Sequence, residues 1–234
     1  MHEEPLARPV STPLTAWLFR GVTAVAVAAL LAPPVLLACT PPFPGRVAGV
    51  LLFTAAWGER MWAMYLRRSC AAAGRDWSAL AIGYSFTLIM GGAIVEFLLR
   101  RRGFGHGGRA AAGAAVYAVA LAVRYWAFVS LGPQWHVDVS DPGHGRRLVR
   151  TGPYRFVRHP IYLGSCLEAV GLPWLLGAWV ALALGVCVFA PLELARARYE
   201  ERFLRGVFGE AYAQYADEVP GFLPRRRRRR KSGG

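Results

Sequence analysis

The chain has 234 residues, of which 55% are hydrophobic and 18% charged, and its formal net charge is +14 at pH 7. This hydrophobicity excludes a disordered chain, and apolar stretches of membrane-spanning length argue against a soluble nucleic-acid-binding protein, so no nucleic acid partner is expected. The cysteines Cys39, Cys70, Cys166 and Cys187 have no CxxC or Cys/His spacing. The sequence therefore predicts no metal site and no disulfide framework, and the thiols are expected to be buried and inert.

The apolar stretches predict an all-α, polytopic membrane helix bundle. A membrane-spanning helix needs about 20 largely apolar residues. The stretches before residue 132 that meet this need are 14–32, 47–66, 80–99 and 110–131. These four spans predict an N-terminal transmembrane bundle over residues 1–131.

A second region, 132–224, starts with a polar segment over 132–158 that is rich in Gly, Pro, Arg and His. Two shorter apolar runs follow, 161–176 and 178–194, broken by Pro173 and Gly177, and they predict a C-terminal helical hairpin. After residue 194 the pattern becomes that of an amphipathic cytoplasmic helix, with Arg196/Glu200 and Glu201/Arg205 as expected ion pairs. The whole chain is thus expected to contain about six spans.

The positive-inside rule orients this bundle. With the N-terminus inside, twenty Lys and Arg residues fall on the cytoplasmic side, and five fall on the other: Arg46, Arg100, Arg101, Arg102 and Arg109. The polar segment and the C-terminal region are therefore expected to face the cytoplasm. The abundance of Arg, Ala and Gly points to a GC-rich bacterial genome, so the expected location is a bacterial plasma membrane.

A polybasic tail, 225–234, ends the sequence. Its seven consecutive cations, residues 225–231, would each gain about 1 kcal/mol beside anionic lipid headgroups, so lipid anchoring is expected. RNA binding would need interleaved aromatic residues, which the tail lacks.

Charged residues also occur inside or near the ends of the apolar stretches. They are Arg20, Glu59, Arg60, Glu96 and Arg124. An unpaired charge in a membrane is costly and marks either a cavity or an ion pair. One interpretation is mutual pairing, for example of Glu59 or Glu96 with Arg124. The other is that an arginine binds an anionic group of a substrate that enters from the lipid. Glu168 poses the same choice.

The segment 148–164 carries the most specific information. Gly152 and Pro153 indicate a turn, and Pro160 suits the first turn of a helix, where its missing N–H has no cost. His159 is therefore expected at a helix entrance that faces the cytoplasm. Free backbone N–H groups there favour a carboxylate, and Tyr154 and Tyr162 offer aromatic faces for a base or a sulfonium cation. Binding of lipid headgroups by the same loop remains an equal alternative.

Several of these residues form an ordered motif, which begins with Gly152-Pro153-Tyr154 and continues with Arg158-His159-Pro160-x-Tyr162-x-Gly164. After the hydrophobic runs come Glu200-Glu201, Leu204, Phe208-Gly209, Tyr212, Tyr215 and Val219-Pro220. This order resembles the isoprenylcysteine carboxyl methyltransferase family, and membrane phospholipid and thiol methyltransferases are similar in the same region. The similarity covers about residues 131–224.

This resemblance implies an S-adenosyl-L-methionine-dependent methyltransferase (EC 2.1.1 class), with the cofactor enclosed by the loop and the C-terminal helix. The implied cofactor-binding residues are Leu148, Val149, Tyr154, His159, Pro160, Ile161, Tyr162 and Glu200. The implied substrate-binding residue is Arg196. A family glutamine aligns with Val139, so Gln134 or His136 replaces it or the pocket differs there.

The chemistry of the methyl acceptor determines whether the site needs a side chain that acts as a base. A carboxylate is already ionised at pH 7 and needs no base, whereas a thiol or amine would need deprotonation by His159 or Glu200. No residue is therefore assigned as catalytic. The expected function is methylation of a lipophilic or small acceptor at the cytoplasmic membrane face; the alternative is a non-enzymatic small membrane transporter or lipid-binding scaffold.

Overall fold

The computed structural model describes residues 35, 38–39, 41–65, 77–104, 107–132 and 147–223. This part of the chain is helical and contains no strand. The predicted span 14–32 and the tail 225–231 lie outside the described residues, as do Arg20, Cys70, Gln134, His136 and Val139.

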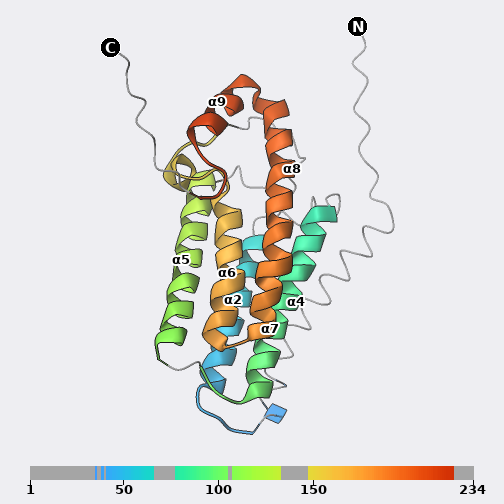
Figure 1. Cartoon of the computed structure of the whole chain (residues 1–234), viewed down its shortest axis with the longest axis vertical. Helices are drawn as coiled ribbons and strands as arrows, with labels where there is room; N and C mark the ends of the chain where they lie inside the picture. Colours follow the sequence, from blue (N-terminus) through green and yellow to red (C-terminus); the bar gives the residue numbers. More distant parts are fainter. Residues whose placement is uncertain are drawn as a thin grey trace.

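Long helices lie side by side and form a bundle (Figure 1). The first are α2 (Arg46–Tyr65), α4 (Trp77–Arg100) and α5 (Gly108–Leu131), at the positions of three predicted spans. After η2 (Gly152–Arg155) come α6 (Pro160–Leu176), α7 (Trp179–Leu184), the π-helical segment η3 (Gly185–Phe189), α8 (Ala190–Phe208) and α9 (Glu210–Glu218). Helix α9 covers the end of the bundle where α6 begins (Figure 1).

Among the described residues, three helical stretches are long and apolar enough to cross a membrane. They are Ala81–Arg100, Gly108–Leu131 and Trp179–Phe208, while the apolar α6 is shorter. Their length and composition are those of an integral membrane protein. The predicted number of six spans stays a prediction.

The chain reverses between α6 and α7 at Gly177, whose φ of 67° is in the left-handed region. From Trp179 the helical run continues through η3 and α8 to Phe208 without a break. The predicted change at residue 194 is therefore a change of surface character and not the start of a separate helix. The π-helical segment ends at Phe189, two residues before Pro191, and lets the run continue although proline has no N–H to donate.

Glycines allow α5 and α6 to approach each other closely. A Cβ atom at Gly171 would lie 2.5 Å from the backbone nitrogen of Tyr117, and one at Gly113 would lie 2.4 Å from that of Leu175. Small residues at such positions bring helix backbones together, which strengthens dispersion contacts in a membrane. The close contact fixes α6, and with it the loop that leads into α6.

Glu96 links α4 to the start of α7. Its Oε1 atom accepts a hydrogen bond from the N–H of Trp179 at 2.9 Å, and its Oε2 atom accepts bonds from Val180 at 3.1 Å and Ala181 at 3.3 Å. Arg100 completes the contact at 2.8 Å. The first N–H groups of a helix lack intrahelical acceptors, so Glu96 has a structural role and is not the partner of Arg124.

The described cysteines differ in part from the prediction. Cys166 is half-buried, but Cys39 and Cys187 are exposed, and all three are free thiols. Both exposed cysteines lie on apolar parts of the chain, where the thiol behaves as a small hydrophobic group. Burial was inferred from the apolar surroundings, yet a bundle in a membrane also presents apolar residues to lipid.

We expect Gly171→Ala to lower the melting temperature of the protein in detergent, because the new methyl group would overlap the backbone of α5. Overpacking of this kind costs about 1–3 kcal/mol. Gly92→Ala is the matched control, since no atom lies within 4 Å of a Cβ atom at that position. Equal melting temperatures for the two variants would contradict the close approach of α5 and α6.

Candidate active site

The loop before α6 has the predicted turn. Gly152 has a φ of 60°, and a Cβ atom there would lie 2.1 Å from Oγ of Ser130 in α5, so glycine is required for both reasons. Pro153 follows in η2, and Pro160 occupies the first turn of α6. His159 is the residue that precedes α6, as the sequence predicts.

His159 lies between two carboxylates of α8. Its Nε2 atom is 3.0 Å from Oε1 of Glu201, and its Nδ1 atom is 3.6 Å from Oε2 of Glu200. Burial alone would lower the pKa of His159, but the hydrogen bonds and charges of the two glutamates outweigh it and raise the pKa above its usual value. The histidine thus favours its protonated form, in which both ring nitrogens donate.

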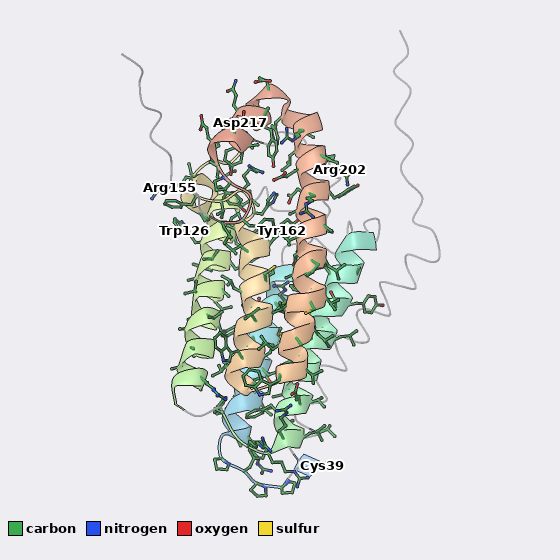
Figure 2. The ribbon with its side chains drawn as sticks, viewed as in Figure 1. Cys39, Trp126, Arg155, Tyr162, Arg202 and Asp217 are labelled. Atoms are coloured by element: carbon green, nitrogen blue, oxygen red, sulfur yellow. The ribbon has the colours of Figure 1, made fainter. Side chains whose placement is uncertain are left out.

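Aromatic rings enclose His159 on two sides. The ring centroid of Tyr162 is 5.6 Å from that of His159, and the ring of Phe222 stacks at 5.5 Å. The Tyr162 side chain also makes a hydrogen bond to Glu200. Figure 2 shows Tyr162 at the end of the bundle that α9 covers, while Cys39 lies at the opposite end.

Arg158 joins α8 to the segment that follows α9. Its guanidinium contacts Oε1 of Glu201 at 2.6 Å through Nη2 and at 3.0 Å through Nε. Its Nη1 atom donates to the carbonyl oxygens of Ala216, at 2.7 Å, and of Val219. The backbone N–H groups of Arg158 and His159 donate to the carbonyls of Pro220, at 2.9 Å, and Gly221, at 3.0 Å.

A small apolar cluster fixes α9 above the loop. Its buried residues are Tyr212, Tyr215 and Val219, and Leu148, Leu204, Phe208 and Ala216 pack against them. The hydroxyl of Tyr215 donates to the carbonyl oxygen of Tyr154 at 2.6 Å. Burial raises the pKa of Tyr215 to about 12 and also raises that of Tyr154, so both phenols stay neutral.

One polar atom in this region has no hydrogen-bond partner among the described residues. It is the hydroxyl oxygen of Tyr212, which is buried. The charges of Glu201, Arg158 and Glu200 act on this phenol. Tyr212 therefore also belongs to the polar cluster around His159. A buried hydroxyl without a partner costs stability, and a polar ligand would supply the missing bond.

The structure brings together only part of the predicted residue set. His159, Tyr162 and Glu200 meet directly, and Pro160 and Ile161 form the first turn of α6 beside them. Leu148 and Tyr154 contact the α9 segment. Val149 is half-buried in the loop, directly after Leu148.

Sequence reasoning missed Glu201, Arg158 and Tyr212 as members of the cluster. Glu201 was expected to pair with Arg205, but it contacts Arg158 and His159 instead. The i,i+4 rule considers only neighbours on the same helix, whereas these partners lie 43 and 42 residues away. The family motif holds all three residues, and that was the available signal.

The charges deeper in the bundle form a second cluster, and they pair with one another. Arg124 contacts both Glu168 and Glu59, the latter at 2.5 Å. Arg60 contacts Glu168 at 3.1 Å and Ser165 at 3.3 Å. Mutual pairing, one of the two interpretations of these charges, therefore describes Arg60, Arg124, Glu59 and Glu168.

The raised pKa of His159 predicts a pH dependence of stability. A group whose pKa is higher in the folded state stabilises the fold fully below its unfolded pKa, near 6.5, and loses this effect as pH rises through the folded value. The melting temperature in detergent should therefore fall as pH rises above about 6.5. Glu201→Gln removes one of the carboxylates responsible, so its profile should be flatter. Identical profiles would contradict the assignment to His159.

Comparison with known proteins finds similarity over the region that holds His159, Tyr162 and Glu200. Residues 113–206 match the profile of the isoprenylcysteine carboxyl methyltransferase (ICMT) family. The protein-S-isoprenylcysteine O-methyltransferase of Schizosaccharomyces pombe is 35% identical over 103 residues, which cover 44% of each chain. The cobalt-zinc-cadmium resistance protein CzcN of Cupriavidus metallidurans is 30% identical over 132 residues, covering 56% of this chain and 61% of that protein.

The matched region is about half the length of these relatives. A solved structure of the eukaryotic intramembrane Ras methyltransferase ICMT is also similar, with a TM-score of 0.48 and 16% identity over 91% of this chain and 97% of that chain. The family profile and the sequence relatives agree with the resemblance found in the motif. Over residues 113–206, the chain is therefore similar to the isoprenylcysteine carboxyl methyltransferase family.

Proposed function

We propose that the chain is a membrane methyltransferase that uses S-adenosyl-L-methionine and methylates a lipophilic or small acceptor at the cytoplasmic membrane face. The observation that carries this proposal is the meeting of His159, Tyr162 and Glu200 within the family's region. These side chains come from the loop, from α6 and from α8, and the segment after α9 encloses them. A lipid-headgroup loop would not need a buried histidine between two carboxylates.

The chemistry of these residues fits S-adenosylmethionine. Its sulfonium and ammonium cations favour carboxylates and aromatic faces, which Glu200, Tyr162 and Tyr154 provide. Its own carboxylate suits the N-terminus of α6, where Ile161 and Tyr162 have backbone N–H groups without an acceptor inside the helix. The unpartnered hydroxyl of Tyr212 is a further polar group for the ligand.

When bound, S-adenosylmethionine supplies an electrophilic methyl group. Methyl transfer neutralises charge, so orientation of the acceptor and exclusion of water can supply much of the rate. The apolar cluster around Tyr212 and Tyr215 excludes water from above, with Leu148 packed against it. Glu200 and His159 are proposed to bind and orient the methyl donor, and Val149, Pro160 and Ile161 to form the wall beside it.

Arg196 is the proposed binding residue for the acceptor. Its side chain is 6% exposed and lies one helical turn before Glu200 on α8. Residues at this spacing share a helix face, so an acceptor at Arg196 would lie on the bundle side of the cofactor residues. A guanidinium also stabilises negative charge on an acceptor atom.

The rival class, a transporter or scaffold, depended on a pathway of intramembrane charges. Arg60 and Arg124 instead pair with Glu168 and Glu59, which leaves that class without a supporting observation. Incubation of membranes with a methyl-labelled donor, followed by separation of lipid, protein and volatile fractions, tests the proposal. Label transfer to one fraction supports it, and absence of both transfer and S-adenosylhomocysteine binding would overturn it.

We expect Glu200→Ala to weaken binding of S-adenosylhomocysteine by about tenfold to a hundredfold, because an enclosed charged acceptor is lost. Isothermal calorimetry in detergent measures this change. Glu218→Ala is the control, since that carboxylate is exposed at the end of α9. Glu201→Ala should lower the melting temperature more than Glu200→Ala does, because Glu201 joins Arg158 and His159. The reverse order would refute these two roles.

Arg196→Ala should raise the apparent KM for the acceptor while the affinity for S-adenosylhomocysteine changes by no more than a few-fold. Arg196→Lys should recover only part of the loss, because an ammonium does not reproduce the fork of a guanidinium. Steady-state kinetics and calorimetry on the same preparations separate the two effects. Loss of cofactor binding with an unchanged KM for the acceptor would assign Arg196 to the cofactor.

A further inference from the structure

Glu193 of α8 is a buried carboxyl group outside the two clusters described above. Its side chain is 1% exposed, and its Oε2 atom accepts no hydrogen bond from the described residues. Buried polar atoms in proteins are almost always hydrogen-bonded. A carboxylate oxygen kept in this state costs stability, so a function for it is the reasonable expectation.

No described residue is a direct partner of Oε2 of Glu193, although several charged side chains lie near enough to act on it. The charges that act on it come from Arg60 on α2, Arg196 and Glu200 on α8, and Arg124 on α5. Arg60 and Arg124 already contact Glu168. On α6, the charge of Glu193 acts on the thiol of Cys166 and on the phenol of Tyr162.

Glu193 lies on the same face of α8 as the proposed binding residues. Residues 193, 196 and 200 follow the i, i+3, i+7 spacing, which lines one side of a helix. At a rise of 1.5 Å per residue, Glu193 is about 10 Å from Glu200 along the axis, with Arg196 between them. An acceptor that reaches the methyl donor from inside the bundle would therefore meet Glu193 and Arg196.

We propose that Glu193 binds the reacting group of the acceptor, and that this acceptor is a neutral lipophilic thiol or phenol. The inference rests on the proposed methyltransferase function and specifies its acceptor class. A carboxylate acceptor would be repelled by Glu193 and needs no base, whereas an S–H or O–H group donates a hydrogen bond to Oε2. Thiols and phenols are mostly protonated at pH 7, so they require a proton acceptor.

The transfer step balances with the residues present. A lone pair on the acceptor's sulfur or oxygen forms the new bond to the methyl carbon, and the acceptor's proton moves to the Glu193 carboxylate. The bond between the methyl carbon and the sulfonium sulfur breaks, and its electron pair stays on that sulfur. Arg196, next to Glu193 along the face, stabilises the negative charge that develops on the acceptor before the new bond is complete.

The experiment compares acceptor classes on the purified chain in detergent. The probes are 4-octylphenol and decanethiol, which carry a proton, and N-acetyl-S-farnesylcysteine, which presents a carboxylate. General-base catalysis contributes about 10²–10⁴-fold, so Glu193→Gln should reduce methylation of 4-octylphenol and decanethiol by at least about a hundredfold. Calorimetry on the S-adenosylhomocysteine complex should show weaker 4-octylphenol binding in the variant and unchanged S-adenosylhomocysteine affinity.

Glu168→Gln is the matched control, because Glu168 is also 1% exposed but pairs with Arg60 and Arg124. It should lower the methylation of 4-octylphenol only in proportion to its loss of folded protein, and the wild-type chain should methylate 4-octylphenol faster than N-acetyl-S-farnesylcysteine. If Glu193→Gln does the same, or if the wild-type complex fails to bind 4-octylphenol, the inference is wrong. Failure of the wild-type chain to bind S-adenosylhomocysteine would instead overturn the proposed function.

Discussion

The Oε1 atom of Glu201 is the point on which the candidate site depends. It contacts Arg158 at 2.6 Å and His159 at 3.0 Å, and these consecutive residues end the loop before α6. Arg158 in turn donates to carbonyl oxygens of α9 and the residue that follows it. Removing one partner of a buried ion pair costs about 3–5 kcal/mol, and this pair is partly exposed, so its cost is smaller. One carboxylate thus orients the loop, α8 and the C-terminal segment together.

The deeper cluster of paired charges stabilises the inside of the bundle. Charges in a membrane are tolerated when they face the interior and pair with one another. Arg60 and Arg124 share Glu168, and Arg60 also lies over the ring of Phe86, 4.0 Å from its centroid. These contacts join α2, α4, α5 and α6 below the candidate site. The two clusters therefore both hold α6, at two levels, and the charges of both act on Glu193 of α8.

The sequence predicted the local features well, because they depend on neighbouring residues. Gly152 and Pro160 identified a turn and a helix start, and the apolar lengths identified α2, α4 and α5 to within a few residues. Contacts between distant residues were not predictable in this way. Spacing along one helix paired Glu201 with Arg205, yet the stronger partner came from the loop. Glu96 was a candidate partner of Arg124, but it binds Arg100 and the free N–H groups at the start of α7.

The backbone bonds from Arg158 and His159 to Pro220 and Gly221 also have a consequence for biosynthesis. A chain leaves the ribosome N-terminus first, and its parts fold in that order. The bundle helices and the loop are therefore made before the residues that close the site above His159. The candidate site is therefore complete only after Gly221 has emerged, when the helices of the bundle have already been made.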